Sequence, residues 1–166
     1  ESKDYFGRIT RYTIDPVTGH TLAITRVTSD LGDISTRYTY NARGQVETIT
    51  DAEGRVTTYH YNELGRLETL ELPSGVAATA FQRFTYDACG NVKTDTDPNG
   101  NITSYEHDVM NRLKIQTDAT PQGNKTTYTY NAEGLPVKLL DARGSTSTTA
   151  YDVMNRLWTV TDGEGG

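Results

Sequence analysis

Apolar and polar positions along the chain follow a pattern that recurs about every 21 residues. Two aromatic residues separated by one position precede an Asn or Asp, as in Tyr38–Asn41 and Tyr59–Asn62. Gly or Asn stands three positions after that residue, and an apolar residue follows two positions later. The second aromatic position recurs at 40, 61, 86, 107, 130 and 151, in steps of 21, 25, 21, 23 and 21. An internal repeat of this period predicts a repeat architecture.

A four-residue segment that begins with Asn or Asp and ends with Gly divides each repeat again. The Asn or Asp side chain caps a turn, and Gly adopts the positive φ that follows. Such turns join antiparallel strands, often with a bulge at the Gly. The segments begin and end at Asn41 and Gly44, Asp51 and Gly54, Asn62 and Gly65, Asp87 and Gly90, Asp97 and Gly100, Asn131 and Gly134, and Asp141 and Gly144.

Five to seven residues rich in Val, Thr, Ile and Tyr separate successive turns, at Gln45–Thr50, Arg55–Tyr61, Asn101–His107 and Thr126–Tyr130. This is an ordinary strand length. Each repeat therefore predicts a β-hairpin, and the array predicts an all-β antiparallel meander. A twisted open sheet of this many strands is too wide to stay flat, so we expect it to curl.

The alternation of apolar and polar side chains along the strands is less regular than the strand length. The second and fifth residues after a glycine are both apolar, as in Val46 and Ile49. A separation of three places two side chains on opposite faces of a regular strand. Either a bulge lies between them or both faces are partly buried, and the pattern leaves both possibilities open. Tyr38 and Tyr40 share a face and are predicted to stack across strands as a ladder.

The array occupies the whole chain of 166 residues, so we predict a single domain over residues 1–166. Residues 1–37 form a degenerate part, with Ile14 in the second aromatic position, and clear repeats span residues 38–162. Insertions lengthen the turns at residues 72–80 and 119–123. Because the array begins and ends within a repeat, we expect the chain to be a fragment of a longer repeat protein.

Composition indicates an ordered but polar β-protein. Hydrophobic residues make up 34% of the chain, against a usual share of about 45–50%, and the net charge is −6. Eleven tyrosines and many threonines suit a half-buried pleated surface and argue against disorder. An acidic chain without a basic stripe is not expected to bind duplex nucleic acid, and no apolar run is long enough to span a bilayer. The single cysteine, Cys89, does not identify the compartment.

The segment Asp95–Glu106 has the spacing of a calcium-binding loop, with Asp97, Asn99 and Gly100 between its ends. The repeat already explains Asp97 and Gly100 as turn residues. No helical pattern flanks the segment, and residues 102–106 are expected to be extended rather than wrapped around an ion. The repeat therefore favours a turn, and calcium binding stays open.

No other pattern indicates an active site. His20, His60 and His107 lie far apart in the sequence, and a surface or tyrosine-ladder role is favoured over metal binding or general-base catalysis. Motifs of metalloproteases, nucleophile elbows, paired cysteines and phosphate-binding loops are missing from the sequence. The aspartates recur as turn caps. We therefore expect no catalytic, cofactor-binding or metal-binding residues and a chain that is not an enzyme.

The repeated motif resembles the YD repeat of the RHS-repeat proteins. The best copies are Tyr61–Leu67 and Tyr151–Leu157, together with Thr-Asp pairs at 50–51, 96–97, 117–118 and 161–162. Departures are Pro136 for Val or Leu, His107 for Tyr, and Asn for Gly at positions 111 and 155, where Asn also tolerates the left-handed conformation. The motif positions are Tyr40, Asn41, Gly44, Asp51, Gly54, Tyr61, Asn62, Gly65, Arg66, Leu67, Tyr86, Asp87, Gly90, Asp97, Gly100, Tyr130, Asn131, Gly134, Asp141, Gly144, Tyr151, Asp152, Arg156 and Leu157.

The resemblance implies a β-sheet that spirals into a hollow shell. In bacterial polymorphic toxins and insecticidal toxin complexes such a shell encloses a toxic C-terminal polypeptide, and teneurin-like adhesion proteins have related repeats. We therefore expect a secreted or cell-surface structural segment whose partners are neighbouring repeats and an enclosed toxin polypeptide. The alternative is an extracellular module that binds a glycan or a cell-surface protein. The unpaired edges of an isolated fragment are predicted to associate edge to edge.

Overall fold

The computed structural model describes residues 1–5, 8–28, 32–73 and 80–163. The described residues form fifteen β-strands and no helix. These strands follow one another in chain order as an antiparallel meander, which confirms the all-β array of hairpins predicted from the repeat. A helix capable of crossing a lipid bilayer is accordingly not found in the described part of the chain.

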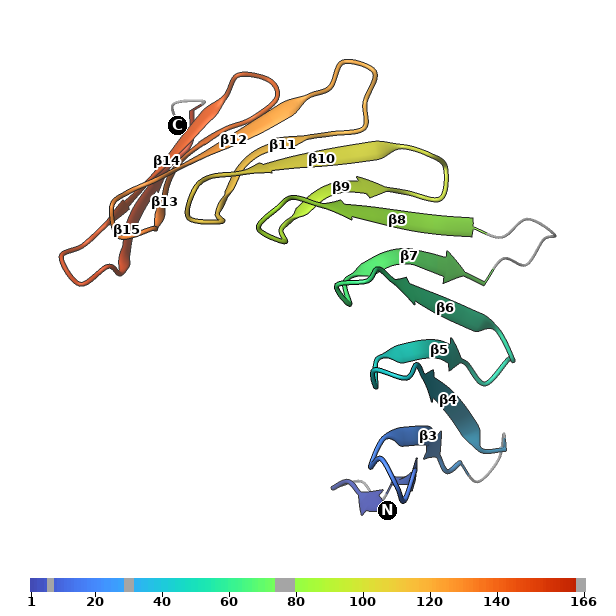
Figure 1. The fold of residues 1–166 in the computed structure, drawn as a ribbon. Coiled ribbons are helices and arrows are strands. Elements are labelled where there is room, and N and C mark those ends of the chain that lie inside the picture. The colour runs from blue at the N-terminus through green and yellow to red at the C-terminus, as the bar shows by residue number, and fades with distance from the viewer. Residues whose placement is uncertain (6–7, 29–31, 74–79, 164–166) are drawn as a thin grey trace. The chain divides into compact units, whose positions relative to one another are not determined.

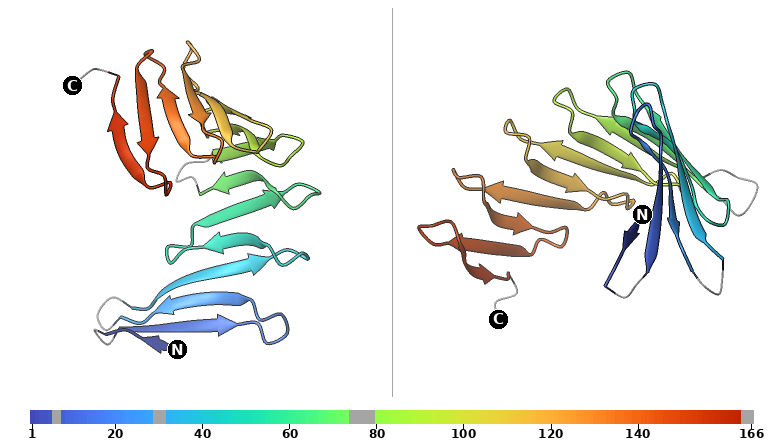
Figure 2. Two further views of the ribbon diagram at one scale, coloured as in Figure 1. Left: turned by 90° about the vertical axis from the view of Figure 1, so that its left-hand side faces the viewer. Right: turned by 90° about the horizontal axis from the view of Figure 1, so that it is seen from below.

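The chain divides into two compact units, residues 1–82 and 83–166. Within each unit, neighbouring strands lie side by side and the chain reverses at alternate ends of the strands (Figure 1 and Figure 2). The first unit contains β1 (Ser2–Lys3), β2 (Ile9–Ile14), β3 (Thr21–Arg26), β4 (Ile34–Tyr40), β5 (Val46–Thr50), β6 (Val56–Tyr61) and β7 (Leu67–Leu72). The boundary falls within β8 (Ala80–Tyr86), and the second unit continues with β9 (Val92–Thr96), β10 (Ile102–His107), β11 (Leu113–Thr117), β12 (Lys125–Tyr130), β13 (Pro136–Leu140), β14 (Thr146–Tyr151) and β15 (Leu157–Thr161).

A β-bulge follows the aromatic end of each hairpin. In β4 and β5, Tyr38 lies opposite Ile49 and Tyr40 lies opposite Val46, so Glu47 is an extra residue in β5. The bulge brings Val46 and Ile49 to the face of the two tyrosines, although they are three positions apart. The same register shift occurs in six other strand pairs of the described chain. A bulge, rather than burial of both faces, therefore explains the irregular spacing.

The bulges give the sheet two different faces. We call the face with the aromatic residues the tyrosine face. On the opposite face, pairs of hydroxyl groups bridge neighbouring strands, with 2.8 Å between the Oγ1 atoms of Thr39 and Thr48 and 2.6 Å between those of Thr85 and Thr94. From β4 to β7 the tyrosine face carries Tyr38, Tyr40, Val46, Ile49, Thr57, Tyr59, Tyr61, Leu67 and Leu70.

The tyrosines of the first unit share a face as predicted, but the predicted ladder of stacked tyrosines is wrong. The rings of Tyr38, Tyr40, Tyr59 and Tyr61 do not stack on one another among the described contacts. The ring of Tyr40 instead stacks on His20 of the preceding hairpin, with centroids 4.4 Å apart and an interplanar angle of 20°. The rings therefore make contacts between hairpins rather than within them.

No side chain in the described ranges is fully buried, so each unit lacks a hydrophobic core. Large apolar side chains at the turns are especially open, with Leu64 76% and Val109 102% exposed. Burial of apolar area is the usual dominant stabilising contribution, and here each side chain is covered only by its neighbours on one sheet. Hydrogen bonds and side-chain contacts between hairpins must therefore supply an unusually large share of the stability.

One of the two lengthened turns, at 119–123, lies entirely within the described residues. It closes with a hydrogen bond of 2.8 Å from the Gly123 N–H to the Thr120 carbonyl, and Gly123 has a φ of 59°. Asn124 then resumes the regular pairing through its carbonyl, which accepts the Asp118 N–H at 2.9 Å. Most of the other insertion, residues 74–79 of the 72–80 segment, lies outside the described residues.

The left-handed turn position provides a first prediction. Gly54 has a φ of 79°, and a Cβ added there would meet no atom within 4 Å, so substitution adds backbone strain without a clash. We expect Gly54→Ala to lower the free energy of unfolding by about 1–2 kcal/mol. Gly54→Asn should cost less than half as much, because Asn111 and Asn155 occupy equivalent positions with φ values of 61° and 59°. Urea denaturation measures both, and equal costs for Ala and Asn would contradict this explanation.

Candidate functional site: the contacts between repeats

Each turn is closed by the side chain of its first residue. Oδ1 of Asp51 accepts the backbone N–H groups of Glu53 at 3.0 Å and Arg55 at 2.9 Å. The backbone N–H of Gly54 donates to the Asp51 carbonyl at 3.1 Å. Because Asn and Asp both offer this oxygen, either residue can begin the turn. The same pair of side-chain bonds occurs at Asn41, Asn62, Asp97, Asp108, Asp141 and Asp152.

The remaining predicted turn residues have matching geometry. Asp87 and Asn131 accept the backbone N–H of the residue four positions later, at 2.9 Å and 2.8 Å. The fourth residue of the turns is left-handed throughout this set. The φ values are 77° at Gly44, 79° at Gly54, 77° at Gly65, 98° at Gly90, 85° at Gly100, 85° at Gly134 and 85° at Gly144.

Hydrogen bonds lower the pKa of five turn aspartates and so favour their charged form. The Arg55 side chain lowers the pKa of Asp51 below its ordinary value of 3.8, with the Arg55 N–H as the next cause. The Arg112 side chain has the same effect on the pKa of Asp108. Side-chain amides are the largest cause of the lowered pKa of Asp87 and Asp97. The largest cause of the lowered pKa of Asp152 is a backbone N–H that donates to it.

A tyrosine hydroxyl ties each of four hairpins to the one before it. Tyr61 Oη donates to the Val46 carbonyl at 2.7 Å, and Val46 is the residue paired with Tyr40 beside the bulge. The ring thus reaches the directly paired strand β5 of the preceding repeat. Partial burial raises the pKa of Tyr61. Equivalent bonds join Tyr40 to Thr21 at 2.8 Å, Tyr130 to Leu113 at 2.7 Å and Tyr151 to Pro136 at 2.9 Å.

The turns at the aromatic ends of the strands also contact one another. Arg43 Nη1 donates to the Glu63 carbonyl at 2.7 Å, and Gln45 Nε2 donates to the Gly65 carbonyl at 2.8 Å. These bonds satisfy backbone carbonyls of the following turn. Side chains at the third and fifth positions of one turn therefore fix the position of the next.

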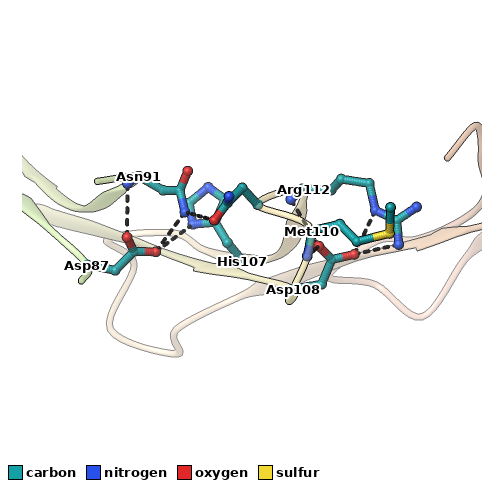
Figure 3. A network of polar contacts seen from close by, with 7 residues as sticks. Asp87, Asn91, His107, Asp108, Met110 and Arg112 are labelled. Carbon is teal, nitrogen blue, oxygen red and sulfur yellow. Dashed lines mark hydrogen bonds and ion pairs between the residues drawn. The ribbon is translucent and has the colours of Figure 1, made fainter. Parts of the chain in front are cut away.

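The turn at 108–112 has a denser set of contacts (Figure 3). Asp108 Oδ2 lies 2.7 Å from Nε and 2.6 Å from Nη2 of Arg112, and the guanidinium carbon lies 4.5 Å from the centroid of the Tyr130 ring. Asn91 of the preceding turn donates to Asn111 Oδ1 at 2.9 Å. The ion pair holds Arg112 within its own turn, while the cation–π contact to Tyr130 and the hydrogen bond between the Asn91 and Asn111 side chains link this turn to the repeats on either side.

His107 occupies the second aromatic position in this same region. Its Nδ1 lies 3.7 Å from Asp87 Oδ2, and its side chain is 15% exposed (Figure 3). That nitrogen is buried and makes no hydrogen bond among the described residues. A histidine cannot reproduce the hydroxyl bond of the tyrosines, so the tie at this position is different.

The Asp95–Glu106 segment does not have the geometry of a calcium loop. Oδ1 of Asp97 accepts the backbone N–H groups of its own turn, and Oδ2 accepts Nδ2 of Asn101 at 2.7 Å. Glu106 belongs to an extended strand and lies on the opposite face, whereas Asp95 lies on the tyrosine face. The described residues contain no group of three His, Cys, Asp or Glu side chains arranged to hold a metal ion.

The histidines lie in separate surroundings. His20 stacks on Tyr40, and His60 is exposed on the opposite face with Nε2 3.6 Å from Glu71 Oε2. The His20 backbone N–H donates to Thr18 Oγ1 at 3.3 Å, but among the described contacts the imidazole of none of the three makes a hydrogen bond to a Ser, Thr or Cys side chain. In the described part of the chain these histidines therefore make structural contacts and are not paired with a nucleophile.

Sequence reasoning missed the tyrosine hydroxyl as a tie between repeats. The available signal was the choice of residue at the second aromatic position. Positions 40, 61, 86, 130 and 151 are all Tyr, whereas the first aromatic position accepts Phe at residue 84. A position that is Tyr in five of the six clear repeats, with His107 as the exception, indicates a hydrogen bond as well as packing.

The tie can be tested with a matched pair of substitutions. Tyr61→Phe removes the hydroxyl that donates to Val46 and should lower the free energy of unfolding by about 1 kcal/mol. Tyr59→Phe is the control, because the Tyr59 hydroxyl has no hydrogen bond among the described residues and lies on the same strand and face. Chemical denaturation followed by circular dichroism compares them, and equal effects of the two substitutions would refute the tie.

Acid should weaken the turns. In the folded chain the pKa values of Asp51, Asp97, Asp108 and Asp152 lie below 3.8, so the unfolded chain takes up protons first as the pH falls. Their contribution is complete above about pH 4 and is lost as the pH passes through the lowered values. Replacing all four with Asn keeps the oxygen that closes each turn. The melting temperature of this variant should fall less than that of the wild type between about pH 4 and pH 2; parallel curves would contradict the assignment.

Solved structures share the fold of this chain. The crystal structures of TcdB2–TccC3 and of TcdB2–TccC3 without the hypervariable C-terminal region match with TM-scores of 0.79 and 0.78, each at 20% identity over 92% of this chain. The Tc holotoxin pore of Photorhabdus luminescens matches with a TM-score of 0.78 at 18% identity over 93% of this chain. In each case the match covers 9% of the larger chain. At these identities the likeness shows the fold.

The sequence itself identifies the family. A search of the curated proteins finds no match. The family model described as RHS Repeat matches residues 40–77, 86–120, 117–146 and 130–166, which together make up more than half of the chain. The chain therefore belongs to the RHS repeat family.

Proposed function

We propose that this chain is a non-catalytic wall segment of an RHS-type shell that encloses and delivers a toxin polypeptide. The observation that supports this role is the use of the repeated side chains. Tyrosine hydroxyls and the side chains of Arg43 and Gln45 are engaged in bonds that hold one hairpin to the next, and the turn aspartates are engaged within their own turns. A chain whose polar residues are committed in this way is suited to form an extended surface.

The structures with the same fold suggest what such a surface covers. One of them is TcdB2–TccC3 without a hypervariable C-terminal region. We propose that the protein containing this chain likewise holds a variable C-terminal polypeptide and is secreted or displayed at the cell surface. Because the chain spans 9% of the length of those neighbours, complete enclosure requires many further repeats.

We propose that the tyrosine face is the one that meets the enclosed polypeptide. Its tyrosine, leucine, isoleucine and valine side chains are only partly covered by their neighbours on the sheet. Covering such apolar area is favourable, whereas the opposite face gains less because threonines and charged residues predominate there. Glu47 and Glu68, the extra residues of two bulges, are both exposed.

A binding module is the second candidate, and one cleft favours it. The space between the turns 41–45 and 62–66 has a volume of about 410 Å³ and is lined by Tyr59, Tyr61, Gln45 and Glu47 among others. Amide, carboxylate and aromatic groups together suit a sugar. A glycan array separates the two roles: saturable binding of one sugar class would support the module and count against the wall segment.

Enclosure can be tested in the full-length protein that contains this chain. The enclosed polypeptide should resist added protease in the native protein and be cleaved once the shell is unfolded. Thr57→Lys adds a charge to the tyrosine face, whereas Thr58→Lys adds the same charge to the opposite face of the same strand. We expect Thr57→Lys to lower protection at least severalfold and Thr58→Lys to leave it unchanged.

Thermal melting provides the control for these two variants, since both must keep the wild-type transition for the comparison to hold. Rapid cleavage of the enclosed polypeptide in the native wild-type protein would overturn the enclosure proposal. A loss of protection in Thr58→Lys alone would instead assign the opposite face to the interior.

A further inference from the structure

The tyrosine face changes character at one place in the second unit. The residue opposite the first aromatic position is apolar in most other hairpins, as in Ile49, Leu70 and Leu139, and is the uncharged Gln116 opposite Tyr105. In β9 this position is Asp95, which lies opposite Phe84 on one side and Thr103 on the other. A carboxylate there replaces an aliphatic side chain on the least polar surface of the sheet.

A second departure lies on the next strand. His107 in β10 takes the position that is Tyr in the hairpins on either side of it. In the hairpins tied by a tyrosine hydroxyl, the ring extends to the carbonyl of the first residue of an earlier strand, as Tyr61 and Tyr130 do. The shorter imidazole does not place a hydroxyl over β9. The space that a tyrosine would cover is therefore left open beside Asp95.

Both departures line one cavity. Its volume is about 250 Å³, and its walls are Phe84, Val92, Asp95, Tyr105, His107 and Leu113. Burial raises the pKa of Tyr105, and the negative charges of Asp95 and Asp118 raise it further, which indicates that the Asp95 carboxylate lies close to that phenol. The cavity thus combines the rings of Phe84 and Tyr105, the His107 imidazole, two aliphatic walls and a carboxylate.

This combination of groups favours the binding of a positively charged group over a neutral or negatively charged one. A cation gains from the faces of Phe84 and Tyr105 and from a charge-assisted hydrogen bond to Asp95. Val92 and Leu113 offer apolar surface to the methylene groups that precede an ammonium or guanidinium. A neutral apolar group would displace water from the Asp95 carboxylate without offering it an opposite charge. An anion would be repelled by Asp95 and by Asp87, which lies beside His107.

We propose that this cavity binds a basic side chain, Lys or Arg, of the polypeptide that the tyrosine face covers. The inference rests on the proposed function and deepens it by naming the chemistry of the contact. Because the cavity is built from residues 84–113 alone, the isolated chain should bind a free amine without any enclosed polypeptide.

The experiment is an NMR titration of the uniformly ¹⁵N-labelled chain with Nα-acetyl-lysine methylamide. The control ligand is Nα-acetyl-norleucine methylamide, which has a similar stem and no charge. We expect saturable shifts centred on Asp95, Tyr105 and His107 with the lysine compound and none with the norleucine compound. Nα-acetyl-arginine methylamide should compete for the same resonances.

Three variants separate binding from folding. Asp95→Asn should weaken lysine binding at least tenfold. Asp95→Leu places the aliphatic residue of most other hairpins at this position and should abolish binding, and thermal melting checks that the variant keeps its fold. Glu106→Gln removes one negative charge from the opposite face of β10 and should bind like the wild type.

Several outcomes would overturn the proposal. These are a lack of saturable shifts with the lysine compound, equal shifts with norleucine, undiminished binding in Asp95→Leu, or equal losses in Glu106→Gln and Asp95→Asn. A negative titration would leave the enclosure proposal standing, because protease protection is measured separately on the full-length protein. Conversely, lysine-specific binding together with rapid proteolysis of the native protein would keep the cavity and reject enclosure.

Discussion

The hydrogen bond from a tyrosine hydroxyl to the backbone of the preceding hairpin is the interaction on which the rest of this structure depends. A sheet whose described residues include no buried core cannot rely on apolar burial in the usual way. Each hairpin is instead stabilised mainly by the hairpins on either side. Such a chain has stability terms that extend only to nearest neighbours, so its length is set by repetition rather than by the volume of a core.

The bulge and the tyrosine act together. The bulge at Glu47 turns Val46 toward the tyrosine face, and Tyr61 of the next repeat donates its hydroxyl to the carbonyl of Val46. The ring covers part of the preceding strand while its oxygen satisfies a backbone acceptor, a dual role that phenylalanine cannot perform. The turns add a second line of contacts along the strand ends, through residues such as Arg43 and Gln45. Two parallel series of bonds thus fix both the spacing and the register of the repeats.

The parts of the fold that depend on local chemistry can be predicted from the sequence. An Asn or Asp followed by Gly at the fourth position specifies a turn by itself, and its recurrence predicts the meander. The bulge cannot be decided in this way, because register depends on pairing across strands, which residue spacing alone does not determine. The prediction of a stacked ladder is wrong because period-two spacing gives the face of a ring but not its direction. The direction follows from a hydroxyl bond to a residue 15 positions earlier.

The cavity in the second unit lies beyond sequence reasoning for a related reason. Asp95 is part of an apparent calcium motif, and His107 is an apparent substitution in a tyrosine series; neither suggests the other. Pairing of β9 with β10 brings them to one face. Because the turns and ties hold the backbone, an aliphatic residue on the tyrosine face can be exchanged for a carboxylate without loss of the hairpin. A repetitive wall can therefore carry a specific recognition group at a position outside its turns and its tyrosine hydroxyl bonds.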